Sequence, residues 1–551
     1  MAHPSKRTLI TACAVLSVAA VLATSACSIN VKGGTSAGKA GTMLVAADNG
    51  SPTFEKNFNP YAPNKRVGTT YMYEPLEVVN TLDGKETPFL ATGHTMPDAK
   101  TVVFDIRQGV KWSDGKAFGP SDVAFTFQLL KDHKELDLKG VWQRVESVSV
   151  DGQKVVFHLK SDDVPAAHVI EQTLIVPEHV WKSVSDPVKE TNAKPVVTGP
   201  YELGAFSPNQ YTLVKNKDYW QADKVAADKL VMPAANTQLD VVNNGYDWAY
   251  AFMTEVDKTW VGANKQHNSY WFPPGGNVSL YPNLTKAPFN DVNFRQGLSW
   301  ALDRTKIANN AEQGYVDAAG QSGLLLPNQK ASLSTDLPDG GAVVQNTQKA
   351  LDFFAKAGYT KKGDSLVDAS GKQLSFSITT ANGYTDWLQG VKTVQGQLKA
   401  AGIDVTINQP QPAAYNQALQ SGDYDLAMGS FGGTGSLYDD FNNLLNSQFA
   451  TPVGTPTTSN FERFSDPQVD QILAKLKATS DPAEQKKLGG QLQSVVYNQV
   501  PAISLFYGGL WGLFSDKQFT GWPSEKNPYA SPMTWDSNPL LILTHLKKAA
   551  A

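Results

Sequence analysis

The first 27 residues constrain the rest of this 551-residue chain more than any other feature of the sequence. Lys6 and Arg7 precede an apolar run over residues 9–23, and small residues then lead to Cys27. A basic start, a short apolar stretch and small residues before a cut site are typical of a secretory signal peptide. The apolar run is too short to span a bilayer comfortably. We therefore expect residues 1–26 to be removed and the remaining chain to fold outside the cytoplasm.

Cysteine usage limits how the folded chain can be stabilised. The 2 cysteines are Cys13 and Cys27, and the first would leave with the signal peptide. The remaining chain would have no disulfide and no cysteine nucleophile, so a hydrophobic core has to hold it together. The end of the signal resembles a bacterial lipobox, although Thr24 stands where that motif usually has Leu. The resemblance implies a lipid on Cys27 that anchors the protein to the membrane. An ordinary secretory cleavage near Ala26, which leaves a free protein, is the alternative.

The charge balance excludes one class of partner. Residues 1–26 hold two basic side chains and no acidic one, so 46 basic and 52 acidic residues remain, a net charge of −6. Nucleic-acid binding needs a basic face, so we expect no nucleic-acid partner. The sequence also has no polybasic patch, so membrane attachment would depend on the lipid on Cys27.

Catalytic and metal-binding motifs are missing from the sequence. Residues 34–38 match the G-x-S-x-G nucleophile pattern, but that motif works only after a strand, and no strand is predicted there. The sequence contains no H-E-x-x-H, no paired C-x-x-C and no P-loop. Asp439 and Asp440 are adjacent, so their side chains diverge and do not form the spaced pair of a glycosidase. We therefore predict a protein that is not an enzyme and that has no cofactor and no metal site.

Length and local patterns predict several domains of mixed α/β structure. About 525 residues follow the signal peptide, more than one hydrophobic core usually supports, which favours two or three domains. Residues 27–41 would be the lipidated cysteine and a glycine-rich, flexible tether. A helix over 384–401 is followed by Gly402 and a strand over 403–407. This helix–glycine–strand order indicates an α/β unit.

Short turn and cap motifs predict where further elements begin. Asp466-Pro467 and Asp481-Pro482 combine an N-cap residue with Pro at the first helical position, which predicts helices over 467–478 and 482–498. Ser121-Asp122 opens another helix. Strands are predicted at 42–48, 102–106 and 154–159, and a hairpin turn at Asp151-Gly152.

Six segments place aromatic residues beside amide or carboxylate groups, often next to Gly or Pro. Gly and Pro break such runs into loops, where binding sites tend to lie. A sugar ring has an apolar C–H face that Trp or Tyr can cover, and a hydroxyl rim that Asn, Asp and backbone groups can bond. A single Trp is more often a core residue than a ligand platform. The segments are 59–61, 71–76, 245–252, 270–283, 431–442 and 506–511.

Motifs spread over most of the chain resemble those of one protein family. The matching segments are Tyr73–Leu76 (YEPL), Phe104–Gly115 (FDIRQGVKWSDG), Val197–Tyr201 (VTGPY), Phe289–Arg304 (FNDVNFRQGLSWALDR) and Gly422–Leu426 (GDYDL). Together they resemble the solute-binding proteins of ABC importers, in the large oligopeptide-type family 5.

The resemblance implies a mixed α/β fold of the periplasmic-binding-protein type (type II, cluster C). In that fold two lobes joined by a hinge close over the ligand, and an inserted subdomain extends the first lobe. The predicted boundaries are 42–75, 195–285 and 511–548 for lobe I, 76–194 for the inserted subdomain and 286–510 for lobe II.

The ligand class is a choice between sugar and peptide. Peptide-binding members usually follow the GDYD segment with a Trp and an Asp-Tyr-x-Asp-Pro run, whose acid meets the peptide amino group. Residues 428–438 read MGSFGGTGSLY and lack both features. Segments 247–249, 271–274 and 281–284 look like the subgroup that binds β-linked gluco- or manno-oligosaccharides. We therefore predict an oligosaccharide, and oligopeptide stays open because Asp439 or Asp440 could pair with an amine.

The expected ligand contacts follow from the oligosaccharide interpretation. The tryptophans would stack on sugar rings, the Asn and Asp side chains would bond hydroxyls, and the glycine-rich loop 431–435 would let backbone approach the ligand. The matches to the family at Arg295, Asp303 and Arg304 are expected to serve helix packing and capping instead. The predicted ligand-binding set is Asn59, Tyr73, Trp248, Phe252, Trp271, Asn283, Phe431, Gly432, Tyr438, Asp439 and Trp511.

The remaining expectations concern partners and location. The resemblance implies a monomer on the extracytoplasmic face of the cell membrane that delivers its ligand to the transmembrane subunits of a permease. A separate ATPase would supply the energy, in keeping with the missing P-loop. The alternatives are an extracytoplasmic glycan hydrolase and a surface receptor that passes its ligand to a sensor.

Overall fold

A computed structural model describes residues 40–48, 53–234 and 238–550. The predicted signal peptide, Cys27 and the tether up to residue 39 lie outside the described residues. Ala40–Ala551 forms one compact unit. Within the described ranges, no helix combines the length and the apolar character that a membrane span requires.

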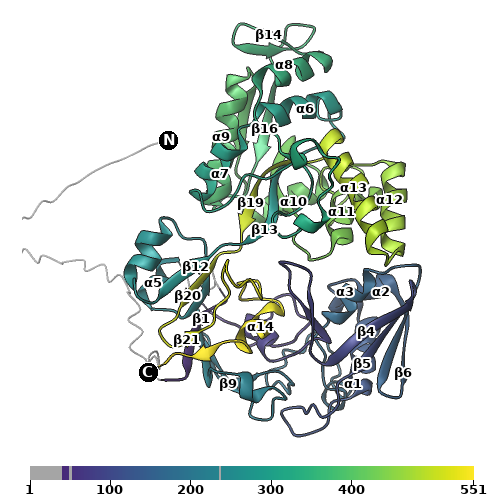
Figure 1. Ribbon diagram of the computed structural model, residues 1–551, viewed down its shortest axis with the longest axis vertical. Helices are drawn as coiled ribbons and strands as arrows, with labels where there is room; N and C mark the ends of the chain where they lie inside the picture. The colour runs from purple at the N-terminus through teal and green to yellow at the C-terminus, as the bar shows by residue number, and fades with distance from the viewer. Residues whose placement is uncertain (1–39, 49–52, 235–237, 551) are drawn as a thin grey trace, which may run out of the picture. The chain divides into compact units, whose positions relative to one another are not determined.

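A seven-stranded sheet contains both early and late parts of the chain (Figure 1). Its strand order is β12-β20-β11-β1-β10-β9-β8, and β1 runs parallel to both β10 and β11. The predicted strand after residue 42 is confirmed as β1. The bounds are β1 Thr42–Ala46, β8 Tyr201–Ser207, β9 Gln210–Lys215, β10 Lys229–Pro233, β11 Trp248–Tyr250, β12 Asn268–Trp271 and β20 Gly512–Ser515.

A four-stranded antiparallel sheet, in the order β4-β5-β7-β6, is built from residues 91–159. The hairpin predicted at Asp151-Gly152 joins β6 to β7. The helix predicted from Ser121 begins one residue earlier, at Pro120, because the Asp122 carboxylate accepts the backbone N–H of the N-cap residue Gly119 at 3.0 Å. The bounds are β4 Ala91–Asp98, β5 Thr101–Ile106, β6 Val145–Asp151, β7 Lys154–Leu159, α1 Pro120–Asp132, α2 Val141–Arg144, α3 Ala166–Glu171 and α4 Glu178–Trp181.

A five-stranded mixed sheet, in the order β17-β16-β18-β13-β19, carries the helices of the second half of the chain. The predicted helix–Gly402–strand unit is confirmed as α9 and β17. The caps predicted at Asp466 and Asp481 are confirmed, since both carboxylates accept backbone N–H groups at the starts of α12 and α13. The bounds are β13 Pro274–Pro282, β16 Ser375–Thr379, β17 Asp404–Asn408, β18 Leu426–Phe431, β19 Ile503–Gly509, α6 Val292–Ala301, α7 Arg304–Glu312, α8 Thr347–Lys356, α9 Thr385–Ala400, α10 Pro412–Ser421, α11 Leu437–Leu445, α12 Pro467–Ala478 and α13 Pro482–Gln499.

Shorter strands and helices complete the fold, and six of the strands form two-stranded ribbons. β2 and β3 form an antiparallel ribbon that precedes β4. The bounds are β2 Glu77–Val79, β3 Glu86–Pro88, β14 Thr360–Lys362, β15 Ser365–Val367, β21 Phe519–Thr520, β22 Lys547–Lys548, α5 Gln238–Asn243 and α14 Asn538–Leu543.

One two-stranded ribbon runs from the seven-stranded sheet into the five-stranded sheet. β12 pairs antiparallel with β20 in the first sheet, and their continuations β13 and β19 pair antiparallel in the second. The crossing falls at Phe272-Pro273 and Leu510-Trp511, where the Leu510 N–H donates to the Pro273 carbonyl at 2.8 Å. β13 therefore belongs to the second sheet, and the ribbon passes between the sheets near residue 273.

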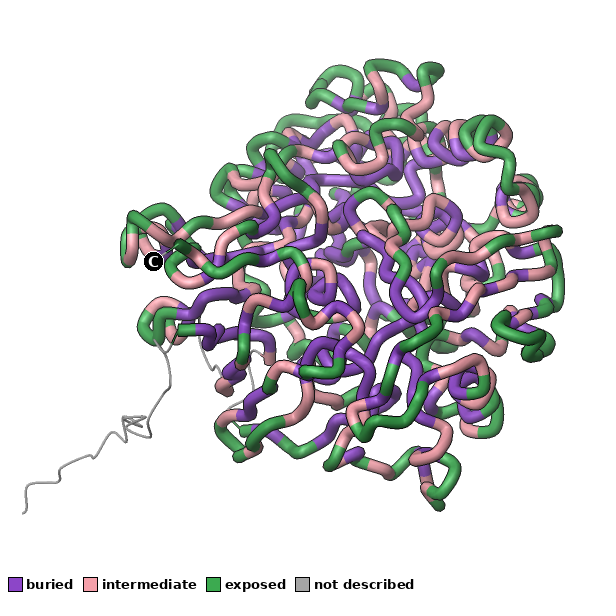
Figure 2. The backbone as a smooth tube through the Cα atoms, turned by 60° about the horizontal axis from the view of Figure 1, so that its bottom comes forward, coloured by how far each residue is buried: buried purple, intermediate pink, exposed green. Residues whose placement is uncertain are grey.

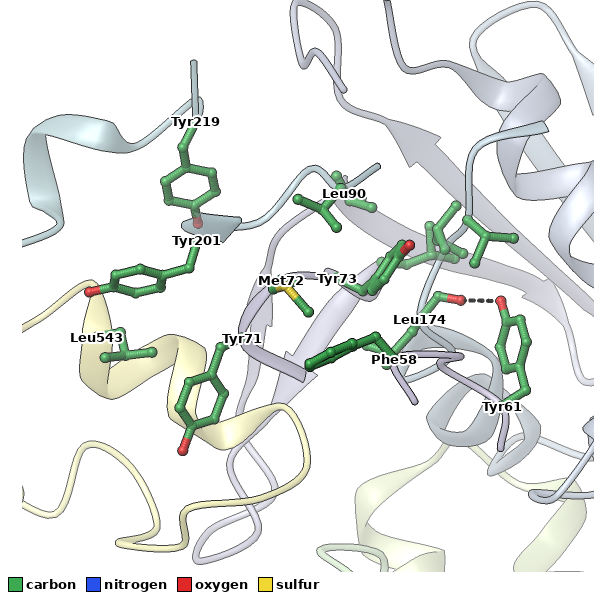
Figure 3. Close-up of a cluster of buried hydrophobic side chains, with 14 of the residues drawn as sticks. Phe58, Tyr61, Tyr71, Met72, Tyr73, Leu90, Leu174, Tyr201, Tyr219 and Leu543 are labelled. Carbon is green, nitrogen blue, oxygen red and sulfur yellow. Dashed lines mark hydrogen bonds between the residues drawn. The ribbon is translucent and has the colours of Figure 1, made fainter. Parts of the chain in front are cut away.

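Separate buried clusters lie under the sheets. One unites the seven-stranded and four-stranded sheets, and two others fill the faces of the five-stranded sheet. Figure 2 shows the buried backbone in purple inside an exposed shell in green. Figure 3 shows part of the first cluster, where the Tyr61 hydroxyl donates to the Leu174 carbonyl at 2.6 Å. Helices and mixed sheets together confirm the predicted mixed α/β class.

Candidate functional site

A cavity of about 800 Å³ lies beside the crossing of the ribbon. This volume falls within the range of sites that bind small molecules. Its walls come from the ribbon, from the segment after α7, and from the loops at residues 82–83 and 524–528. The lining residues are Leu82, Asp83, Tyr270, Trp271, Phe272, Pro273, Pro274, Gly314, Tyr315, Val316, Asp317, Pro327, Asn328, Tyr507, Ser524, Glu525, Lys526 and Pro528.

Aromatic rings dominate one wall of this cavity. The rings of Tyr270 and Phe272 lie 4.8 Å apart, and both meet Tyr315 edge to face at 5.8 and 5.7 Å. Trp271 is half-buried and lies at the end of β12. Edge-to-face packing holds such rings rigidly, so they present a preorganised apolar surface.

Polar groups of mixed character complete the lining. Asn328 donates to the Pro274 carbonyl at 3.0 Å, which ties its loop to the ribbon. Asp83, Asp317 and Glu525 bring three carboxylates and Lys526 one amine. Aromatic faces next to carboxylates and an amide can bind a polyhydroxylated molecule, and the same carboxylates can bind a cationic amine.

Of the eleven sequence-predicted ligand residues, all of which are described, Trp271 is the one that lines this cavity. Two others lie behind its wall. Trp511 packs edge to face on Phe272 at 4.9 Å, and Phe252 packs on Trp511 at the same distance. Trp511 is buried, so it supports the aromatic wall from behind instead of facing the cavity.

Four other predicted ligand residues are fully buried and bonded within the protein. The indole of Trp248 stacks on Tyr71 and donates to the Pro532 carbonyl at 3.2 Å. Tyr73, in the cluster of Figure 3, accepts a hydrogen bond from Asn192 at 2.8 Å.

The amide groups of Asn59 and Asn283 are likewise occupied. The Asn59 NH₂ donates to two backbone carbonyls, those of Pro187 and Glu190, and the Asn283 NH₂ donates to those of Gly422 and Tyr424. With both N–H groups used inside the protein, neither amide has a donor left for a ligand hydroxyl. The site proposed below excludes Asn59, Asn283, Trp248 and Tyr73. These groups are buried and bonded within the protein, so they have no route to a ligand.

The glycine-rich loop makes contacts within the protein. A Cβ on Gly433 would lie 2.2 Å from the Gly275 carbonyl oxygen, so the small residue lets the loop approach the ribbon. Phe431 is buried and Gly432 has φ +81°. The close backbone approach predicted for this loop therefore exists, but the approaching group is the protein's own strand β13.

Tyr438 and Asp439 follow this loop, in the first turn of α11. The Tyr438 hydroxyl donates to Asn442 at 3.1 Å, and Asp439 lies 3.5 Å from the Arg144 guanidinium. Arg144 also pairs with the buried Asp163, whose carboxylate lies 3.0 Å from the Lys477 amine. These ion pairs join the four-stranded-sheet region to the helices of the five-stranded sheet, and they engage Asp439 there instead of at the cavity.

Sequence reasoning missed most of the cavity lining. Tyr270, Phe272 and Tyr507 belong to the aromatic segments 270–283 and 506–511, but the predicted ligand-binding set does not include them. Tyr315 and Asp317 carry no local signal, because the bridge between Ala318 and Phe506 that brings them to the ribbon joins distant parts of the chain.

The structural roles expected for the charged residues of segment 289–304 are confirmed. Asp303 accepts the Lys306 N–H at the start of α7. The buried guanidinium of Arg295 donates to the carbonyls of Phe289, Gln499 and Val500, so it joins α6 to the end of α13.

A buried acid at the end of α7 predicts a pH-dependent stability. Glu312 is 1% exposed, and its Oε2 finds no hydrogen-bond partner among the described residues. Burial, with a smaller effect of nearby Asp386, raises the pKa of Glu312 to about 9. In the folded protein this carboxyl therefore keeps a proton that the unfolded chain loses above about pH 4.3. The Glu312 contribution thus destabilises the fold progressively as the pH rises from about 4 to 9.

We expect Glu312→Gln to raise the free energy of unfolding by about 1–3 kcal/mol at pH 8, because it removes an ionisable group that must stay neutral in the fold. At pH 4 both states of the wild type carry the proton, so the gain should vanish. Urea unfolding at pH 4 and at pH 8 measures this gain. Glu135 is exposed, so the control Glu135→Gln should leave the free energy of unfolding unchanged at both pH values. A gain of equal size at both pH values would contradict the assignment.

The comparison with known proteins identifies the family to which this fold belongs. The profile of the bacterial extracellular solute-binding proteins, family 5 Middle, matches residues 85–452. The chain therefore belongs to the family 5 extracellular solute-binding proteins, and it has their type II periplasmic-binding-protein fold.

Individual relatives cover nearly the whole chain at low identity. The oligopeptide-binding protein AppA of Bacillus subtilis is 27% identical over 529 residues, which cover 90% of this chain and 93% of AppA. The solved periplasmic oligopeptide-binding protein of a Thermotoga maritima oligopeptide ABC transporter superposes with a TM-score of 0.84 at 24% identity, over 92% of this chain and 99% of that chain. The same Thermotoga protein with bound mannohexaose has a TM-score of 0.77, at 24% identity and over 93% and 99% of the two chains. At this identity the structural likeness establishes the fold.

Proposed function

We propose that this protein captures a neutral oligosaccharide of β-linked gluco- or manno-type in the cavity beside the ribbon and delivers it to an ABC permease. The observation that carries the proposal is the aromatic wall of Tyr270, Trp271, Phe272 and Tyr315 in a cavity of about 800 Å³. Flat apolar rings next to carboxylates and an amide match the two faces of a sugar. The mannohexaose found in the Thermotoga neighbour supports the ligand class.

The proposed mechanism is closure about the ribbon. The strands β12–β13 and β19–β20 pass from one sheet to the other, so rotation at residues 272–273 and 510–511 would change the width of the cavity. Binding shifts an equilibrium between open and closed forms only if the ligand contacts the closed form better. Because the lining comes from both sides of the crossing, closure would bring more of it against the ligand.

Location and partners follow from the family and from the first 27 residues of the sequence. We propose a monomer with a lipid on Cys27 that holds it at the extracytoplasmic face of the membrane, next to the permease. Metabolic labelling with a fatty acid tests the anchor, because Cys27→Ala should abolish the label.

The second candidate ligand is an oligopeptide. Asp83, Asp317 and Glu525 in the lining favour it, since a carboxylate can pair with a peptide amino group. Calorimetry with panels of manno- and cello-oligosaccharides and of short peptides separates the two ligands. Heat of binding and a raised melting temperature with sugars support the proposal, and a response to peptides alone refutes it. Release of shorter sugars during incubation would instead identify a glycan hydrolase.

We expect Trp271→Ala to weaken oligosaccharide binding by about 1–3 kcal/mol, because the indole offers a large apolar face to a sugar ring. The matched control is Trp300→Ala, since Trp300 is also half-buried but lies on α6, where Lys349 covers its ring. Titration calorimetry on both variants measures the difference. Equal affinities in the two variants would remove Trp271 from the site.

A further inference from the structure

Four side chains that can ligate a metal lie together away from the aromatic cavity. They are Glu77 on β2, Glu86 on β3, His94 on β4 and Glu171 at the end of α3. One ligand atom from each lies within 4.8 Å of the others. Opposite ligands of one transition-metal ion are up to about 4.4 Å apart, since each bond is about 2.2 Å long. The cluster is therefore close to the size of a coordination shell.

The distances centre on the His94 ring. Its Nδ1 lies 2.6 Å from the Glu77 carboxylate, 3.8 Å from that of Glu171 and 4.0 Å from that of Glu86. The register of the β2–β3 ribbon explains two of these positions, because Val79 pairs with Glu86 and places the two glutamates on neighbouring strands.

Glu171 supplies a second, independent observation that points to a cation at this cluster. Its side chain is 0% exposed, and neither carboxylate oxygen has a hydrogen-bond partner among the described residues. Its nearest basic groups are the imidazoles of His168, at 3.4 Å, and His94, at 3.8 Å. Buried carboxylates in native proteins are almost always satisfied, by hydrogen bonds or by a cation.

An open route to the cluster exists. A cavity of about 320 Å³ is lined by Glu86, His94 and His168 on one side and by residues 435–438 on the other. Glu86 is the most exposed member of the cluster, with a 46% exposed side chain at the mouth. Two of the four proposed ligands, Glu86 and His94, therefore line a cavity that a hydrated ion can enter.

We infer that Glu77, Glu86, His94 and Glu171 form a site for a divalent transition-metal ion, Zn²⁺ or Mn²⁺. One imidazole nitrogen and three carboxylate oxygens are the donors that these ions accept, whereas Ca²⁺ prefers six to eight oxygens. Bound metal would join the β2–β3 ribbon, β4 and α3. His168 continues this connection, because its second ring nitrogen, Nε2, lies 3.0 Å from the Thr434 carbonyl of the glycine-rich loop.

The site is tested on the untagged, chelator-treated protein by calorimetry and thermal unfolding with ZnCl₂, MnCl₂ and CaCl₂. We expect one equivalent of Zn²⁺ or Mn²⁺ to bind and to raise the melting temperature. In Glu171→Gln and in Glu86→Gln the affinity should fall at least tenfold. The exposed Glu146→Gln on β6 is the matched control and should bind as the wild type does.

The Glu86 variant keeps the test decisive if the buried Glu171 variant folds poorly, because Glu86 is half-exposed. No binding of Zn²⁺ or Mn²⁺ up to millimolar concentration, binding of Ca²⁺ alone, or equal affinity in both cluster variants and the wild type would overturn the inference. These measurements need no sugar or peptide, so they are independent of the proposed transport function.

Discussion

Replacement of Arg304 by Met is expected to lower the free energy of unfolding by about 3–5 kcal/mol, the largest loss that we predict for a side chain outside the cavity. The Arg304 guanidinium is buried, and it donates to the backbone carbonyl of Ser504 at 2.7 Å and to that of Ser299 at 2.9 Å. It also donates to the Ser299 hydroxyl at 2.8 Å.

The physical reason is the acceptors that the substitution leaves behind. Met fills much of the volume of the Arg stem but has no N–H group, so the Ser504 carbonyl would stay buried without this partner. Each unsatisfied buried acceptor costs about 1–3 kcal/mol. Burial lowers the pKa of Arg304 to about 10, so the wild-type side chain remains charged at neutral pH.

Urea unfolding at pH 7 measures the loss, and Lys306→Met is the matched control. Lys306 lies on the same helix α7, and its side chain is exposed. The control should change stability by less than 0.5 kcal/mol, as surface substitutions usually do. A loss below about 1 kcal/mol in Arg304→Met would show that water replaces the guanidinium.

Local sequence rules predicted many helices and turns of the fold, because the signals for a cap, a hairpin or a helix end each act over a few residues. The caps at Asp466 and Asp481, the hairpin at Asp151-Gly152 and the turn at Gly402 are all decided within one helical turn or one hairpin. The ribbon that joins two sheets carries no such local signal, since the sheet to which β13 belongs is decided by its distant partners β18 and β19.

The cavity was much harder to predict than the fold. Trp248 and Trp271 stand in similar aromatic segments, yet Trp248 lies on β11 between β1 and β20, whereas Trp271 ends the edge strand β12. Sheet order, which depends on pairing across hundreds of residues, decides which indole is exposed. The four residues of the proposed metal site span positions 77–171 and share no motif. No local pattern in the sequence therefore indicates this site, and the sequence analysis predicts none.

The second large effect is expected at Gly433, where the glycine-rich loop meets the ribbon. Gly433 has φ +78°, and a Cβ there would lie 2.2 Å from the Gly275 carbonyl oxygen. Gly433→Ala should lower the free energy of unfolding by about 2–5 kcal/mol. Of this, about 1–2 kcal/mol is the left-handed backbone of a non-glycine residue, and about 1–3 kcal/mol is the displacement of packed backbone.

Gly109→Ala separates these two contributions, because Gly109 has φ +79° and no atom within 4 Å of an added Cβ. We expect this control to show the backbone cost alone, so that urea unfolding finds Gly433→Ala less stable by a further 1–3 kcal/mol. Because the Gly275 carbonyl belongs to β13, one residue after the cavity-lining Pro274, only the Gly433 variant should also weaken ligand binding. Equal losses in the two variants would mean that the loop moves away from the ribbon at little cost, and that the contact does not position the cavity wall.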